Sequence, residues 1–220
     1  LRDVPRTEKP RPVHFNTWEA MYFDLSLERL CTLADQAAAV GAERFVLDDG
    51  WFNNRRSDSA GLGDWFVDET IFPQGLSPLI DHVQAKGMEF GLWVEPEMVN
   101  PDSDLYRAHP DWILSAETGL GDAPLLLARN QLVLDLTRSE VQDYLFDCID
   151  GLLSQYSISY LKWDMNRALS QPGGTNQPGG AKGRAVTHYQ TLALYRLLAR
   201  IRQAHPTVEI ESCASGGGRA

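Results

Sequence analysis

Short apolar runs alternate along this chain with longer stretches in which apolar residues recur every three to four positions. The short runs have the length and composition of buried strands. They occur at residues 13–18, 44–47, 89–94, 131–135, 159–163 and 208–211. Helical spacing follows at residues 27–40, 76–83, 141–152 and 192–201, and a short helix is predicted around Leu105. This alternation predicts a parallel sheet covered by helices.

Two local signals refine these boundaries. Residues 137–140 read Thr-Arg-Ser-Glu, which has the form of a capping box and predicts that Thr137 caps the helix that follows. Residues 171–180 are rich in glycine, proline and polar residues and predict a flexible loop.

Polar and aromatic side chains follow directly after the predicted strands. The carboxyl ends of parallel strands meet at one edge, and chemistry gathered at several successive strand ends is typical of a (β/α)₈ barrel. A doubly wound sheet is the alternative, but it would more often carry a glycine-rich nucleotide-binding turn after its first strand, and none follows here. We therefore predict an α/β fold of the TIM-barrel type, of which this chain covers about strands 1 to 6.

Composition excludes several functional classes. The chain has 220 residues, of which 43% are hydrophobic and 23% charged, and its net charge is -10. We expect no nucleic-acid partner, because no basic stripe is available to bind phosphates. Three widely spaced cysteines and five scattered histidines form no metal-binding pattern, so we expect no metal or cofactor. The cysteine pattern favours a reducing, cytoplasmic location, and no apolar run is long enough to span a membrane.

The fifth predicted strand ends in a cation and a carboxylate two residues apart. Strand geometry places Lys162 and Asp164 on the same side of the sheet. A carboxylate beside an ammonium stays ionised at neutral pH, which suits a nucleophile or a hydrogen-bond anchor. A structural salt bridge at a strand end is the alternative interpretation.

Other strand ends carry further candidates. Asp48 and Asp49 follow the second strand, and adjacent carboxylates are suited to bind neighbouring hydroxyls of a sugar. A helix cap beside a solvated carboxylate is the alternative. Tryptophans also stand close to strand ends, where they serve either as core residues or as platforms for a flat ligand: Trp18, Trp51 and Trp93.

The predicted third and fourth strands end in acidic residues as well. Glu95 and Glu97 could act as acid and base or as supports, and we favour support. Asp135 could stabilise Lys162 or Arg129 and is not expected to be catalytic.

At this point the sequence resembles a known family. It is similar to the catalytic domain of bacterial α-galactosidases of glycoside hydrolase family 36, whose relatives include raffinose-type synthases. The resemblance is carried by residues 16–20, 48–52, 93–100, 129–135, 161–167 and 211–219, in the order of that family. It implies release of terminal α-linked galactose from raffinose- or melibiose-type oligosaccharides, through a covalent intermediate with retention of configuration.

The resemblance also assigns roles. It implies that Asp164 is the nucleophile. It implies substrate binding by Trp18, Asp48, Asp49, Trp93, Arg129, Lys162, Cys213 and Gly216. In the family the acid/base carboxyl lies on the next strand end, and no residue up to Ala220 matches it. We therefore expect the isolated chain to be impaired or inactive.

The same resemblance divides the chain. Residues 1–10 are interpreted as a linker from an N-terminal β-sandwich domain, and residues 11–220 as a partial catalytic barrel. The full-length protein is expected to be a homo-oligomer. Two alternatives stay open at this stage. One is a galactosyltransferase similar to raffinose synthase, and the other is a galactoside-binding remnant without catalysis.

Overall fold

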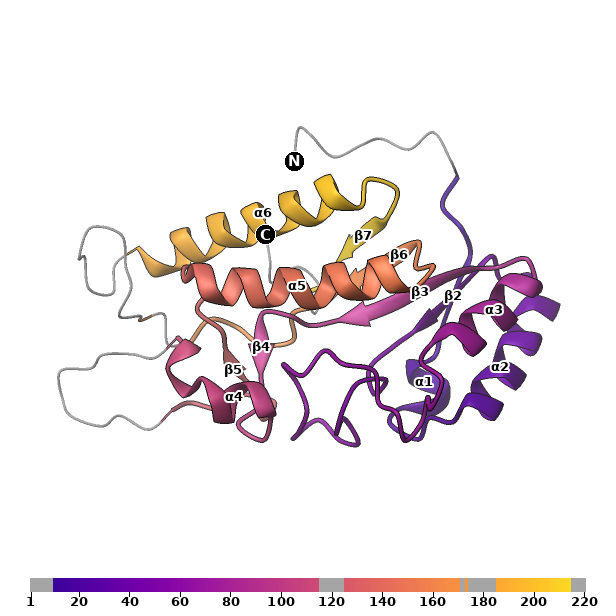
Figure 1. Ribbon diagram of the computed structural model, residues 1–220, viewed down its shortest axis with the longest axis horizontal. Coiled ribbons are helices and arrows are strands. Elements are labelled where there is room, and N and C mark those ends of the chain that lie inside the picture. The colour runs from indigo at the N-terminus through magenta and orange to yellow at the C-terminus, as the bar shows by residue number, and fades with distance from the viewer. Residues whose placement is uncertain (1–9, 115–124, 171–172, 174–184, 215–220) are drawn as a thin grey trace.

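The computed structural model describes residues 10–114, 125–170, 173 and 185–214. A parallel sheet of five strands forms the centre of the molecule, in the order β1-β2-β3-β6-β7 (Figure 1). The strands are β1 His14–Asn16, β2 Arg44–Leu47, β3 Glu89–Val94, β6 Tyr160–Trp163 and β7 Glu209–Ser212. The predicted parallel α/β arrangement is confirmed for these strands.

Helices connect the parallel strands and bury one side of the sheet. Helices α2 and α3 lie side by side near the start of the chain, and α5 and α6 lie side by side near its end (Figure 1). The helices are α1 Trp18–Met21, α2 Leu27–Ala39, α3 Ser77–Ala85, α4 Asp104–Ala108, the 3₁₀ helix η1 Pro110–Trp112, α5 Ser139–Gln155 and α6 Val186–Ala204. None of the helices in the described ranges is long and apolar enough to cross a membrane.

The two sides of the sheet differ in chemistry because side chains alternate along each strand. Phe45, Leu47 and Leu92 lie on the side that packs against the helices, within one continuous hydrophobic core. On the opposite side, Arg44 and Lys162 occupy equivalent alternating positions. The sheet therefore presents a polar side on which charged residues can meet.

Gly91 in β3 leaves room for the Tyr160 side chain on the polar side of the sheet. A Cβ atom at Gly91 would lie 2.7 Å from Cδ1 of Tyr160 and 3.1 Å from Cγ2 of Val46. Real Cβ atoms do not approach other atoms this closely, so the absence of a side chain lets the Tyr160 ring cross the neighbouring strand.

The predicted fourth strand is not part of the parallel sheet. Its centre forms β5 Leu132–Val133, which pairs antiparallel with β4 Met98–Val99. β4 begins four residues after β3 ends, and β5 uses it as its hydrogen-bonding partner in a separate two-stranded sheet. The parallel sheet of the described residues thus has five strands, where six were expected.

The predicted capping box is also wrong. Arg138 is the N-cap residue of α5, and no side chain caps that end. The Thr137 hydroxyl and main-chain N–H instead donate to Oδ1 of Asp135, 2.6 and 3.0 Å away. A carboxylate two residues before Thr137 competes successfully for its hydroxyl. The predicted linker and flexible loop, at residues 1–10 and 171–180, lie outside the described residues except for Pro10 and Gly173.

Candidate active site

The carboxyl ends of the five parallel strands bring distant residues to one rim of the sheet. Asp48 follows β2, Glu95 follows β3, Asp164 follows β6 and Cys213 follows β7. The register places Trp93 directly opposite Lys162 on neighbouring strands. Side chains separated by more than a hundred residues therefore contact one another.

Asp48 is held by four hydrogen bonds in a buried position. Its Oδ2 accepts Nζ of Lys162 at 2.8 Å and Nδ2 of Asn16 at 2.6 Å. Its Oδ1 accepts the main-chain N–H of Asp49 at 2.9 Å, and its own N–H donates to Oγ1 of Thr17 at 2.9 Å. Burial alone lowers the pKa of Lys162, but the charge and hydrogen bond of Asp48 raise it above its usual value. Lys162 is thus a fixed cation at the rim.

Asp164 is a buried carboxylate that stays ionised. Its side chain accepts Nε1–H of Trp93 at 3.1 Å, Nδ2–H of Asn166 at 2.6 Å and the main-chain N–H of Met165 at 2.9 Å. The Cys213 thiol also donates to it. Burial raises the pKa of Asp164, but these donors together outweigh burial and lower the pKa below its usual value.

Asp49 is used differently from its neighbour. Both of its carboxylate oxygens accept from Arg55, with Nε–Oδ1 2.9 Å and Nη2–Oδ2 2.7 Å. Burial raises the pKa of Asp49, and the Arg55 guanidinium opposes that shift. A buried bidentate ion pair therefore holds Asp49 at the rim, and its expected role as a partner of substrate hydroxyls stays a prediction.

Glu95 lies beside Asp164 and is almost fully buried. Its Oε1 accepts the main-chain N–H of Asn166, and its Oε2 accepts Nε2–H of Gln131 at 3.0 Å. Burial raises the pKa of Glu95 to about 7, with a further contribution from the Asp164 charge. Glu97, by contrast, accepts Nε1–H of Trp163 at 3.0 Å. Glu95 is thus held at the rim by uncharged donors.

The three tryptophans do not form one platform. Trp93 reaches Asp164, whereas Trp51 is fully buried and donates Nε1–H to the carbonyl oxygen of Trp93 at 2.9 Å. Trp18 is half-buried and packs edge-on against Tyr22 and Phe23. The structure therefore assigns Trp51 to the core and leaves Trp93 as the tryptophan in contact with the carboxylate.

Of the two remaining proposed site residues, the structure describes only Arg129, and none of its described contacts reaches this cluster. Arg129 is exposed and has a left-handed backbone conformation, with φ 54°. Gly216 lies outside the described residues. The expected contact of Asp135 with Lys162 or Arg129 is wrong, since Asp135 binds Thr137 and lies 4.0 Å from Arg138. A strand that turned into an antiparallel ribbon carries Asp135 away from the parallel rim.

Sequence reasoning missed the residues that hold the carboxylates in place. Asn16 and Asn166 donate to Asp48 and Asp164, and Arg55 neutralises Asp49. Asn16 is the last residue of β1 and Asn166 stands three residues after the end of β6, and this position near a strand end was the available signal. Arg55 follows Asp49 by six residues in a loop, where spacing alone does not identify a partner.

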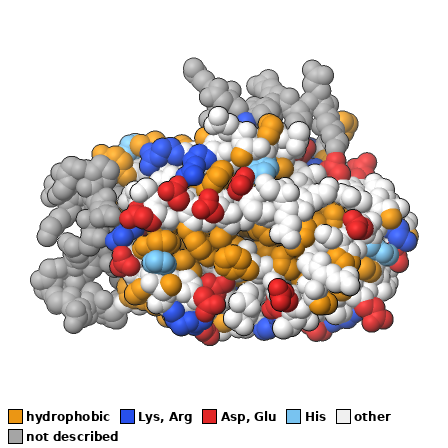
Figure 2. All heavy atoms as spheres, in the orientation of Figure 1, with side chains coloured by type: hydrophobic (Ala, Val, Ile, Leu, Met, Phe, Trp, Pro, Cys, Tyr) orange, Lys and Arg blue, Asp and Glu red, His pale blue; other side chains and the backbone are white. Residues whose placement is uncertain are grey.

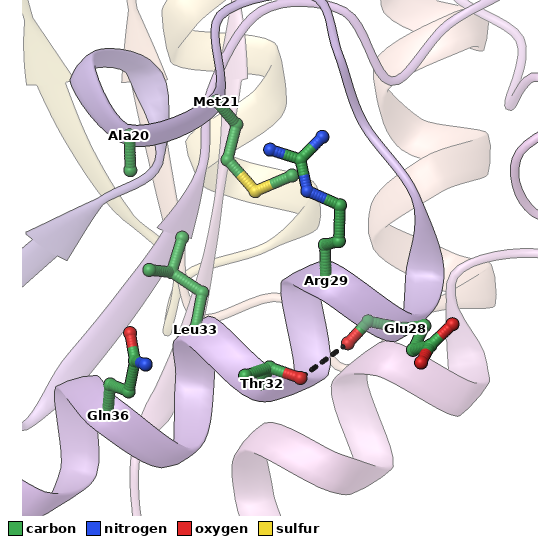
Figure 3. Close-up of a pocket in the computed structure, with 7 residues that line it drawn as sticks. All are labelled: Ala20, Met21, Glu28, Arg29, Thr32, Leu33 and Gln36. Atoms are coloured by element: carbon green, nitrogen blue, oxygen red, sulfur yellow. Dashed lines mark hydrogen bonds between the residues drawn. The ribbon is translucent and has the colours of Figure 1, made fainter.

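A pocket elsewhere contributes nothing to this cluster. It lies between α1 and α2, and its lining residues are Ala20, Met21, Glu28, Arg29, Thr32, Leu33 and Gln36 (Figure 3). Within the described part of the chain, His, Cys, Asp and Glu side chains form no group of three or more suited to a metal ion. The rim itself combines the ionised Asp164 carboxylate with the Lys162 cation.

Known proteins resemble this chain over most of its length. The profile of the melibiase family matches residues 4–220. The alpha-galactosidase of Escherichia coli is 51% identical over 212 residues, which cover 96% of this chain and 28% of the relative. The chain thus spans little more than a quarter of the length of that curated relative.

Solved structures show the same similarity. The GH36 alpha-galactosidase AgaB from Geobacillus stearothermophilus superposes with a TM-score of 0.89 at 45% identity, over 95% of this chain and 28% of that chain. A variant of AgaA from the same organism, in complex with raffinose, superposes with a TM-score of 0.88 at 44% identity, again over 95% and 28%. The five-stranded sheet accordingly forms part of the TIM-type barrel found in these enzymes.

Proposed function

This chain belongs to the melibiase family, and we propose on that basis that it carries the nucleophile of a retaining α-galactosidase. The substrates would be oligosaccharides ending in α-linked galactose, of the raffinose or melibiose type. The relatives support this proposal, because they are named alpha-galactosidases and one was solved with raffinose. The observation that carries the proposal is the buried Asp164 carboxylate, kept ionised by its hydrogen-bond donors.

In the proposed reaction, an Asp164 oxygen attacks the anomeric carbon of the galactose through an oxocarbenium-like transition state. The bond to the leaving-group oxygen breaks, and that oxygen takes a proton from a general acid. Water then attacks the galactosyl ester, transfers a proton to the same group acting as base, and releases galactose with its configuration retained. A low pKa suits Asp164 for this role, because the nucleophile must be charged at working pH.

Asp48 and Lys162 are proposed to bind galactose hydroxyls at the rim. Their ion pair leaves Lys162 with further N–H donors, and the exposed fraction of its side chain, 23%, gives them access to a ligand. Asp49 contributes indirectly, because its oxygens are already paired with Arg55. Cys213 is proposed to border the same sugar, since its thiol contacts the nucleophile. Roles for Trp18, Arg129 and Gly216 remain proposals that rest on the family resemblance alone.

We propose that the acid/base carboxyl is supplied by residues outside those described. A retaining enzyme needs it roughly 5–5.5 Å from the nucleophile and accessible to substrate. At the rim, Asp48 and Asp49 are paired with cations, and Glu95 is only 1% exposed. A substrate with a good leaving group needs little acid assistance. We therefore expect this chain to act on an activated aryl α-galactoside far better than on melibiose.

A labelling experiment tests the proposed nucleophile. An α-galactosyl fluoride with a further fluorine on the ring slows both steps and lets the covalent intermediate accumulate. Mass spectrometry should find one galactosyl adduct on the wild type, at Asp164, and none on the Asp164→Asn variant. Saturable galactoside binding without any adduct would contradict the proposal and favour a binding remnant. Transfer of galactose to sucrose in excess of hydrolysis would favour a synthase.

Cellular location and assembly are further proposals. Cys31, Cys148 and Cys213 form no disulfide among the described residues, which supports a reducing, cytoplasmic location. Consecutive exposed leucines at residues 125–127 support self-association of the whole protein. Figure 2 also shows a band of hydrophobic side chains across one face of the molecule, and such bands are typical of interaction surfaces.

A further inference from the structure

Glu95 is a buried rim carboxyl to which the proposed reaction gives no part. Its hydrogen-bond donors are the main chain and the side-chain amide of Asn166 and the side-chain amide of Gln131, all of which are uncharged. In the described ranges of the chain it forms no salt bridge. A buried carboxyl held in this way is costly, and its position beside Asp164 calls for a reason.

Asn166 joins this carboxyl to the proposed nucleophile. Its main-chain N–H is bound by Glu95, and its side-chain Nδ2 donates to Oδ2 of Asp164 at 2.6 Å. Asn166 is therefore held by a hydrogen bond to Glu95 and donates another hydrogen bond to Asp164. We propose that Glu95 is a positioning residue for Asp164 that acts through Asn166, an inference that rests on the proposed function.

The second anchor of Glu95 strengthens the argument. Gln131 donates its side-chain Nε2–H to Glu95. The main-chain carbonyl oxygen of Gln131 accepts from Arg167, the residue directly after Asn166. Residues 166 and 167 are thus held by the residue that follows β3 and by the residue that precedes β5. The antiparallel ribbon that was unexpected from the sequence fixes the segment after β6, and that segment aims a hydrogen bond at Asp164.

Charge at this position is set by few groups. The carboxylates facing Glu95 are Asp164 after β6 and Asp49 after β2, and Asp49 is neutralised by Arg55. Since burial raises the pKa of Glu95 to about 7, it gains a proton just below neutral pH while Asp164 stays charged. Oε1 of Gln131 has no partner among the described residues. If the Gln131 amide flips so that Oε1 faces Glu95, this oxygen can accept a hydrogen bond from the protonated Glu95 carboxyl.

The inference is tested by the labelling rate at Asp164 as a function of pH. In the wild type, the rate constant should rise through about pH 7, because ionised Glu95 is the stronger acceptor for Asn166 and adds negative charge beside the nucleophile. Glu95→Gln keeps the shape and can pair with a turned Gln131, so it should label without that rise. Glu95→Ala removes the anchor and should label at least about tenfold more slowly.

A second measurement keeps the test independent of turnover and of folding losses. The indole N–H of Trp93 donates to Asp164, and that of Trp163 donates to Glu97. In nitrogen-15 NMR spectra the Trp93 signal should titrate near pH 7 in the wild type and lose that step in Glu95→Gln. Glu97→Gln is the matched control, since it removes a buried carboxyl from the same segment and should leave the Trp93 titration unchanged.

The outcomes separate the two proposals. Absence of any adduct on wild-type Asp164 would overturn the proposed function, and this inference with it. If wild-type Asp164 is labelled but folded Glu95→Gln and Glu95→Ala keep its rate and pH profile, only the positioning role is overturned. A Trp93 titration near pH 7 that survives in Glu95→Gln would overturn it as well.

Discussion

Individual hydrogen-bond donors decide the charge state of the rim. Asp164 is buried, yet donors from β3, from the segment after β6 and from the end of β7 lower its pKa. Asp48 is matched to a single cation from a strand 114 residues away. Each carboxylate is thus controlled by one or two named side chains, and single substitutions should reveal them.

Trp93→Phe is predicted to raise the pKa of Asp164, because it removes one donor to the ionised form and keeps an aromatic ring. A lowered pKa stabilises the folded protein above the unfolded pKa, and that stability is lost as pH falls through the folded pKa. Trp93→Phe should therefore cost about 1.5–3 kcal/mol of unfolding free energy at neutral pH and less in acid. Urea unfolding at several pH values measures this. Trp51→Phe is the control, because the Trp51 indole donates to the uncharged main-chain carbonyl oxygen of Trp93, and its loss should show no such pH dependence.

Lys162→Met is predicted to leave Asp48 with its amide donors but without a cation. Lys162 is partly exposed, so the loss should stay below that of a fully buried pair, at about 1–3 kcal/mol of unfolding free energy. Labelling of Asp164 should also become slower if Lys162 binds the sugar as proposed, because that charged contact is then lost. Lys86→Met, at the exposed pair with Asp35, is the control and should leave the unfolding midpoint unchanged. Equal losses in both variants would contradict a special role for Lys162.

At the scale of elements, the positions of the strands along the chain are predictable from the sequence, whereas the pairing partner of each strand is less so. Strand geometry predicted Lys162 and Asp164 on one side of the sheet. Trp93 lies opposite Lys162 on the neighbouring strand and donates to Asp164, in agreement with that prediction. The run at 131–135 has the same apolar character, yet it folds into a two-stranded ribbon with β4. A short apolar run indicates that a segment is buried. It does not indicate which strand that segment pairs with, because the pairing depends on the path of the chain between the strands.

Gly91→Ala is predicted to disturb the packing between β3 and β6. The new methyl group would overlap the Tyr160 ring, and overpacking of this kind costs about 1–3 kcal/mol. Gly151→Ala provides a matched control in α5, where no atom lies within 4 Å of the added Cβ. There the substitution should stabilise the protein by about 0.5–1 kcal/mol, since alanine favours a helix. Thermal unfolding of both variants measures the difference, and losses of similar size would contradict the proposed close approach.

Across the whole molecule, one buried cation ties the start of the chain to its end. Arg44 in β2 donates to Glu89 in β3, and its Nη2 lies 2.9 Å from Oε2 of Glu209 in β7. Its guanidinium also stacks 4.4 Å from the centre of the Tyr160 ring. Burial and the Arg44 charge lower the pKa of His14, so its ring can accept a hydrogen bond from Arg44. The polar side of the sheet is held together by this cluster.

Arg44→Met is predicted to lower the free energy of unfolding by about 3 kcal/mol, because Glu89 and Glu209 would be left half-buried without their cation. Amide exchange should quicken first in Glu209–Ser212, at the edge strand. Hydrogen-exchange mass spectrometry and urea unfolding measure these effects. Arg107→Met, at an exposed pair, should change neither. Unchanged protection of β7 in Arg44→Met would show that the cluster does not hold that strand.

The sequence by itself determined the parallel α/β fold, the family, and the polar candidate residues at the strand ends. Those properties depend on local periodicity and on motifs of adjacent residues. Only the tertiary structure decided that Lys162 binds Asp48, that Arg55 occupies Asp49, and that Glu95 reaches Asp164 through Asn166. The physical reason is that a hydrogen bond requires two groups within about 3 Å, and the neighbours of a strand are set by the order of strands in the sheet.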